Sequence, residues 1–163
     1  MSKASVWLLA ILSVLATLLI MYLGYGYSRY PKMPFKCTTF TVYDLSHDQQ
    51  SLTLRLSQDL RLQDRDSGHF LVKGSAISQG KSAVVNRTLN LTDGGAVDSD
   101  TFRYRISDIV KSSTDTLPDP LFEQWLDEII VRPGLFQIDV VEAPSGAWII
   151  GSPVSFLFTC KPY

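Results

Sequence analysis

The longest apolar run of the chain covers residues 6–23 and has only Ser13 and Thr17 as polar interruptions. As a helix, a run of this length extends about 27 Å, close to the thickness of the hydrocarbon core of a bilayer. Trp7 lies near one end of the run and several tyrosines follow the other, where aromatic rings favour the headgroup layer. The run therefore predicts a transmembrane anchor over residues 1–28.

A cleaved signal peptide is the alternative interpretation of this segment. The apolar core of a signal peptide has about 7 to 15 residues and precedes a small-x-small cleavage site. Here the core is longer, and only Gly-Tyr-Gly at residues 24–26 weakly resembles such a site. Residues 29–36 follow as a basic juxtamembrane linker, because Pro31 and Pro34 cannot extend the helix. We expect one folded domain over residues 37–163.

From residue 37 onward the pattern has a period of two, which is typical of half-buried strands. Phe40 and Val42 alternate with threonines. Residues 52–62 place leucines on one face and polar side chains on the other, with a bend expected near Gln58. The same alternation predicts further strands over residues 70–76, 83–91, 102–106, 135–142 and 147–160.

Turn residues separate these predicted strands. They cluster at residues 64–68, at Gly80, at 93–95 and at 144–146. Inside the strand of residues 70–76, Gly74 predicts a bulge or a close approach of another backbone. Connections this short favour an antiparallel meander.

Only residues 118–131 break the period of two. Asp119 suits the N-cap position of a helix and Pro120 the first helical position. The apolar stripe of this helix consists of Leu121, Phe122, Trp125, Leu126, Ile129 and Ile130. The chain therefore predicts an α+β fold, mainly antiparallel β, with seven or eight strands in a small barrel or strongly curved sheet and the helix over one opening. An open sheet with the helix on its face is the alternative.

The distribution of charge bears on partners and on orientation. All 16 acidic residues but only 11 of the 15 basic residues lie in residues 37–163, so the domain is mildly acidic and is a poor candidate for binding nucleic acid. Arg29, Lys32 and Lys36 follow the apolar run, whereas only Lys3 precedes it. The positive-inside rule then favours a cytoplasmic domain.

The cysteines favour the opposite orientation. Cys37 and Cys160 lie at the two ends of the domain, and the first and last strands of a closed sheet are often neighbours. They predict a disulfide, and hence an oxidising compartment such as the periplasm. Two buried free thiols are the alternative.

Catalytic chemistry has no signature in this sequence. His47 and His69 are the only histidines, and neither is spaced from other residues as in a zinc site or a catalytic triad. We therefore expect no enzymatic activity, no cofactor and no metal ion.

Arg87 is the residue that stands out. Its place in the alternation puts it with Val85 and Leu89 on the inner face, where an unpaired charge is costly. A partner carboxylate or an anionic ligand is expected there, unless the side chain reaches water. With Arg87, the aromatic residues Phe102, Tyr104 and Trp125 are candidate contacts for a ligand or partner, and ordinary core packing is their alternative role.

The chain combines one predicted membrane helix, a basic segment after it and Cys37 at the start of the domain. An Asn-Arg-Thr-Leu strand lies at residues 86–89, an acidic entry at 115–119 leads into a Trp-bearing helix, and the terminal strand covers 156–160. This whole pattern resembles the FidL-like family of small enterobacterial inner-membrane proteins.

Membership would imply a single-pass protein with a periplasmic, lipocalin-like barrel that partners a ToxR-like membrane-bound transcriptional regulator, in the manner of ToxS-like proteins. Some complexes of this wider group sense bile-type amphiphiles, so a small amphiphile such as a bile acid is an expected ligand. A structural or assembly component of an envelope complex fits the same tether and domain. A membrane-tethered enzyme would need Arg87 or His69 in a cleft beside a group with a perturbed pKa.

Overall fold

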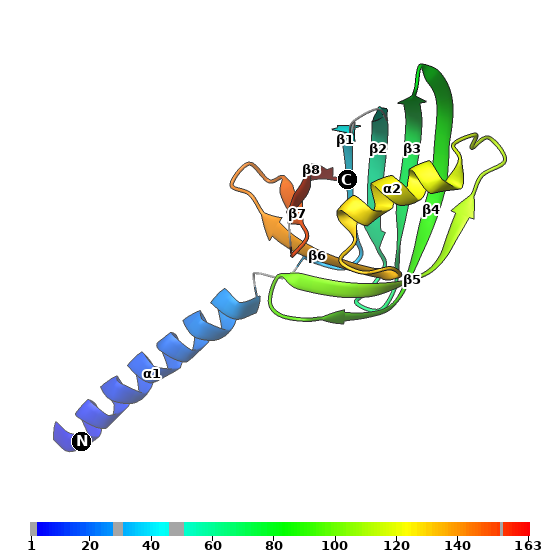
Figure 1. The fold of residues 1–163 in the computed structure, drawn as a ribbon. Coiled ribbons are helices and arrows are strands. Elements are labelled where there is room, and N and C mark those ends of the chain that lie inside the picture. Colours follow the sequence, from blue (N-terminus) through cyan, green and yellow to red (C-terminus); the bar gives the residue numbers. More distant parts are fainter. Residues whose placement is uncertain (1–2, 28–30, 46–50, 154) are drawn as a thin grey trace. The chain divides into compact units, whose positions relative to one another are not determined.

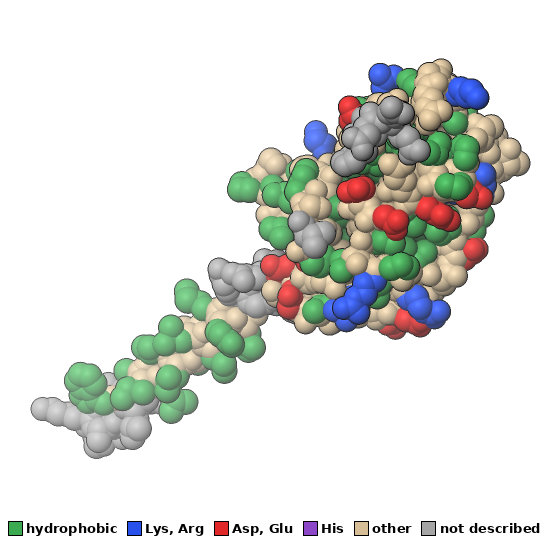
Figure 2. Space-filling model, in the orientation of Figure 1, with side chains coloured by type: hydrophobic (Ala, Val, Ile, Leu, Met, Phe, Trp, Pro, Cys, Tyr) green, Lys and Arg blue, Asp and Glu red, His purple; other side chains and the backbone are tan. Residues whose placement is uncertain are grey.

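The computed structural model divides the chain into two compact units, Met1–Tyr30 and Pro31–Tyr163. It describes residues 3–27, 31–45, 51–153 and 155–163. The first unit contains α1 (Lys3–Tyr27), so a helix is present where the apolar run predicts one. Hydrophobic side chains cover much of its described surface (Figure 2). Within the described part of the chain, no helix combines the length and apolar character needed to cross a membrane.

The second unit is a closed barrel in which each strand pairs antiparallel with the next along the chain (Figure 1). The described strands are β1 (Phe35–Asp44), β2 (Leu52–Leu62), β3 (Gly68–Ser78), β4 (Lys81–Ala96), β5 (Thr101–Lys111), β6 (Leu135–Glu142), β7 (Trp148–Gly151) and β8 (Phe156–Pro162). β8 pairs back with β1 and so closes the sheet. The mainly β prediction is confirmed, and the barrel, not the open sheet, is the observed form.

The turns expected at residues 64–68, at Gly80 and at 144–146 connect β2 to β3, β3 to β4 and β6 to β7. The turn expected at residues 93–95 is wrong, because β4 continues through it to Ala96. The pairing of β4 with β5 shifts register there, so the extra residues form a bulge. A Cβ on Gly94 would lie 2.5 Å from the ring of Tyr104, which explains why a glycine is needed at this bulge.

The single strand expected over residues 147–160 is also wrong. It is a hairpin of β7 and β8, joined by a tight turn in which the backbone N–H of Ser152 donates to the carbonyl of Ser155 at 2.7 Å. Pro153 has no backbone N–H, so it cannot continue a ladder of strand hydrogen bonds. Val154, which the sequence placed in phase with Phe156, lies outside the described residues.

The inner face of the barrel follows the predicted alternation. On β2 the leucines point inward, and the pairing with β1 and β3 runs through Gln58 without a register shift. Gln58 itself is buried, and its Nε2 donates to the Tyr43 hydroxyl at 2.6 Å. On β3, Gly74 marks a close approach and not a bulge, because a Cβ there would lie 2.0 Å from the carbonyl oxygen of Arg55.

Helix α2 (Asp119–Ile129) crosses the concave side of the long strands (Figure 1). Its buried residues include Phe122 and Trp125, whose rings reach Arg87 on β4 and Tyr43 on β1. The N-cap is Pro118, not Asp119 as the sequence predicts, because the Asp119 carboxylate pairs with basic side chains of the barrel instead of capping the helix.

The disulfide predicted between Cys37 and Cys160 is present. Their Cα atoms are 5.5 Å apart, and both residues are buried. The bridge therefore ties β1 to β8 at the point where the barrel closes.

Candidate functional site

Arg87 lies on the inner face of β4, as its parity predicts, and its side chain is 5% exposed. Nε and Nη2 donate to the two carboxylate oxygens of Asp115, both at 3.2 Å. Nη2 also donates to the Leu117 carbonyl at 2.7 Å and lies 2.8 Å from the Asp119 carboxylate. The guanidinium carbon lies 4.3 Å from the centre of the Phe122 ring. Protein groups, not water, therefore satisfy this charge.

Asp115 is the centre of the network, and its side chain is fully buried. Burial on its own would raise the pKa of the carboxyl group. Hydrogen bonds from Arg87 and from the backbone N–H of Asn86, together with the charge of Lys111, outweigh burial and lower the pKa. Asp115 also accepts a hydrogen bond from the backbone N–H of Leu117 at 3.1 Å. An ionised Asp115 thus fixes the segment before α2 to β4.

Lys111 and Asp119 extend the network toward the surface. Lys111 Nζ donates to the Asp119 carboxylate and to the Leu117 carbonyl, both at 3.0 Å. The hydrogen bond and charge of Lys111, with a smaller contribution from Arg87, lower the pKa of Asp119. Because Lys111 ends β5 and Asp119 begins α2, the network holds the first turn of α2 against the barrel.

The three aromatic candidates, Phe102, Tyr104 and Trp125, are all completely buried. Trp125 packs against Phe122 with ring centres 5.2 Å apart and so reaches Arg87 through that ring. The Tyr104 hydroxyl has no hydrogen-bond partner among the described residues, and burial raises its pKa to about 12. These rings belong to the core, and their role as contacts for a ligand or partner stays a prediction.

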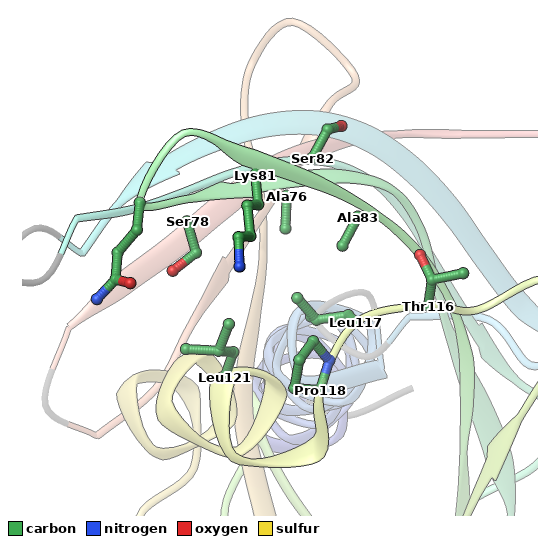
Figure 3. Close-up of a pocket in the computed structure, with 10 residues that line it drawn as sticks. Ala76, Ser78, Lys81, Ser82, Ala83, Thr116, Leu117, Pro118 and Leu121 are labelled. Atoms are coloured by element: carbon green, nitrogen blue, oxygen red, sulfur yellow. The ribbon is translucent and has the colours of Figure 1, made fainter.

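An open groove separates the start of α2 from the hairpin of β3 and β4. Its volume is about 330 Å³. Figure 3 shows Ala76 and Ala83 pointing from the two strands toward Leu117 and Leu121, which form the opposite wall. These four side chains make both walls of the groove apolar at this point.

Polar groups lie at the hairpin end of the same groove. Ser78 and Lys81 are paired in register, and both side chains point into the groove (Figure 3). A second cavity of about 200 Å³ shares Ser78 and Leu121 and extends along α2 to Gln124. Arg87 lines neither cavity.

The closing pair of the barrel leaves one strand edge open. Only Cys37 and Thr38 of β1 are in register with β8. Residues 39–43 pair with β2 on one edge and, among the described residues, with no strand on the other. Phe40 and Val42 face outward on this segment and are 65% and 55% exposed. A free edge beside exposed apolar side chains is suited to the addition of a further strand.

His69 lies beside two amides. Its Nδ1 is 3.0 Å from Asn90 Oδ1, and its Nε2 is 3.4 Å from Gln63 Nε2. Over the described ranges, no three histidine, cysteine or acidic side chains are grouped as a metal site would require. His47 lies outside those ranges.

The partners of Arg87 were not identified from the sequence. Asp115 follows Arg87 by 28 residues, and the two meet only because the loop after β5 folds back along β4. The sequence did give one signal, because an unpaired arginine on the inner face is costly. This cost predicts a carboxylate partner but does not identify which carboxylate it is. The groove was missed as well. Its signal was a pair of alanines, Ala76 and Ala83, at inward positions where neighbouring residues are large.

A family model described as "FidL-like putative membrane protein" matches residues 74–160, more than half of the chain. The matched region runs from the middle of β3 into β8 and includes Arg87, Asp115, all of α2 and Cys160. No curated protein and no solved structure matches the chain.

Proposed function

Since this chain belongs to the FidL-like family, we propose that it is a non-enzymatic, single-pass inner-membrane protein. In this proposal the apolar run of residues 6–23 is the anchor and the barrel lies in the periplasm. The barrel binds and modulates a ToxR-like membrane-bound transcriptional regulator by contacting the periplasmic domain of that regulator.

The membrane location is supported by the apolar run of residues 6–23 and by the description of the family. The periplasmic side is supported by the disulfide between Cys37 and Cys160, because such bonds persist in oxidising compartments. The basic residues 29–36 favour the opposite orientation. Orientation therefore has its own experiment.

The observation that carries the partnership is the open edge of β1. The backbone groups on the outer edge of residues 39–43 pair with no strand among the described residues, and Phe40 and Val42 offer apolar surface beside them. A partner strand laid along this edge would satisfy those backbone groups and cover both side chains. Association through an edge in this way needs no catalytic group on either protein.

Site-specific photocrosslinking of the full chain in its native cells tests the partnership. A photoreactive amino acid replaces Phe40, and the crosslinked protein is identified by mass spectrometry. The expected product is a one-pass membrane protein with a cytoplasmic DNA-binding domain. The matched control is the same replacement at Val84, which is outward-facing and 46% exposed, but whose backbone is already bonded to Thr116. Equal capture of the regulator from both positions would contradict the role of the β1 edge.

Thiol labelling tests the orientation. A membrane-impermeant maleimide is applied to intact cells and to cells with a permeabilised outer membrane, before and after reduction. We expect Cys37 and Cys160 to react only after reduction and without breaching the inner membrane. Free thiols that react only when the inner membrane is opened would place the barrel in the cytoplasm.

A structural role in an envelope complex is the second candidate. The packing around Arg87 favours it, because the charge is met by Asp115, Asp119 and the Phe122 ring and not by a cavity. The same crosslinking experiment separates the two candidates. Capture at Phe40 of a secretion or division component, and of no regulator, would replace the first candidate by the second.

A further inference from the structure

The groove beside α2 exists because two opposed residues of the barrel wall are small. Ala76 and Ala83 face each other across β3 and β4, and both line the groove. Farther along the same inner face, Val72 and Leu89 fill the space toward the core. The alanine pair therefore leaves an apolar recess under Leu121, next to the start of α2.

Lys81 brings an uncommitted positive charge to this recess. It shares the inward parity of Ala83 and Arg87, and Figure 3 shows its amine directed into the groove. Arg87 is held by carboxylates, whereas no ion pair involves Lys81 among the described residues. Among the described residues, no acidic side chain lines either cavity, while Ser78 lies in register with Lys81. The open end of the groove thus complements a negative charge.

The dimensions favour a small and flexible ligand. Ligand pockets in proteins range from roughly 300 to 1,000 Å³, and the main cavity, at about 330 Å³, is at the lower limit. The second cavity prolongs it along α2 and gives an elongated shape. A short aliphatic chain fits this shape better than a rigid fused-ring body.

We propose that this groove binds a small carboxylate amphiphile. The head group lies at Lys81 and Ser78, and the aliphatic chain lies between Ala83 and Leu121 and continues toward Gln124. The inference adds a small-molecule site to the proposed function. It places this site in the groove beside the start of α2 and not at the aromatic candidates Phe102, Tyr104 and Trp125, which lie in the core. It does not require the partner, so the two proposals fail separately.

Photoaffinity labelling of the full chain in phosphatidylcholine nanodiscs tests the site. The probe is a decanoate that carries a diazirine near its methyl end, with unlabelled decanoate, decanol and a bile acid as competitors. The expected crosslinks fall on Leu121 and its neighbours in α2, and decanoate competes better than decanol or the bile acid. Crosslinks elsewhere in the barrel, or equal competition by decanol, would overturn the proposal.

Substitutions at the head-group end of the groove provide a second test of the proposed site. Lys81→Met keeps the length of the side chain and removes its charge, so affinity for the probe falls about tenfold, whereas Lys81→Arg retains binding. The matched control is Lys73→Met, an exposed lysine on β3 that lines neither cavity. Ala83→Leu fills the recess and abolishes labelling if circular dichroism shows the barrel intact. Unchanged labelling of Lys81→Met would exclude the anionic head group even if Ala83→Leu fails to fold.

Discussion

Arg87 and Asp115 form the most demanding pair at the scale of single residues, because both charges are removed from water. Such a pair contributes little net stability compared with apolar residues, but breaking it leaves an uncompensated charge. Here Asp115 also accepts backbone hydrogen bonds from Asn86 and Leu117. The pair therefore specifies where the segment before α2 lies. Apolar contacts are not directional and would not fix this position in the same way.

We predict that Asp115→Asn lowers the free energy of unfolding by about 2–3 kcal/mol near neutral pH, somewhat less than the ~3–5 typical of a broken buried pair, because Asp119 and the Leu117 carbonyl still contact Arg87. The measurement is chemical denaturation of the full chain. Lys73→Met, at an exposed site, is the control and should stay within about 0.5 kcal/mol of wild type.

The pH dependence of the same variant follows from the lowered pKa of Asp115. A carboxyl group with a lowered pKa in the folded state stabilises that state above its ordinary pKa of 3.8 and loses this contribution as pH falls through the folded-state pKa. The difference in stability between wild type and Asp115→Asn should therefore shrink below about pH 3.8. A difference that stays constant to lower pH would show that ionisation of Asp115 does not contribute.

The buried Tyr104 and the half-buried Tyr43 allow a paired prediction. The Tyr104 hydroxyl has no partner in the described structure, whereas the Tyr43 hydroxyl accepts a hydrogen bond from Gln58. Tyr104→Phe should therefore leave stability unchanged or raise it by about 1 kcal/mol, while Tyr43→Phe should lower it by about 1 kcal/mol. Thermal unfolding followed by circular dichroism measures both. A loss for Tyr104→Phe would reveal a hydrogen bond to water or to another group.

At the scale of elements, β2 and β3 approach each other closely at Gly74. Its φ of 157° and the nearby Arg55 carbonyl leave no room for a Cβ. β3 remains in register with both neighbours through this point. The glycine thus lets three long strands curve together beneath α2 without a bulge.

We predict that Gly74→Ala destabilises the barrel by about 2–4 kcal/mol, because the added Cβ would lie 2.0 Å from the Arg55 carbonyl oxygen and the strands would have to separate. Gly95→Ala is the control, since a Cβ there meets nothing within 4 Å. Its effect should stay within about 0.5 kcal/mol. Equal effects in thermal unfolding would contradict the close approach.

At the scale of the whole molecule, the barrel is closed by few backbone pairs and one covalent bond. Register joins β1 to β8 at only two positions, and the disulfide joins residues separated by 123 in sequence. A crosslink over so long a loop removes much of the freedom of the unfolded chain. Closure of this barrel therefore depends on the disulfide more than it would if β1 and β8 were paired along their full length.

The double substitution Cys37→Ser and Cys160→Ser should lower the free energy of unfolding by about 3–5 kcal/mol, the range expected for a loop of this length. Hydrogen exchange should show the loss concentrated in β8 and the start of β1, with β3 and β4 still protected. Treatment of wild type with a reductant is the control and should reproduce both effects. Uniform loss of protection over all strands would show that the bridge supports the entire barrel.

The period of two was sufficient to predict most of this fold. It identified the inward faces of β2 and β4, because burial on one face of a strand constrains every second residue. It failed at residues 93–95 and 147–160, where residues typical of turns and residues typical of strands occur in the same segment. At residues 93–95 the chain forms a bulge, where the Arg65 carbonyl oxygen and the Tyr104 ring both pack against Gly94, and neither contact is visible in the local sequence.

By itself, the sequence determined the helix of the apolar run, the β-rich domain, the cysteine pair and the inward position of Arg87. Each of these follows from local periodicity or from composition. Only the tertiary structure decided which carboxylate meets Arg87, that β1 keeps an open edge, and that Ala76 and Ala83 leave a recess facing Lys81. These features join residues far apart in the chain, and their pairing depends on strand register and on the path of α2, which no local pattern encodes.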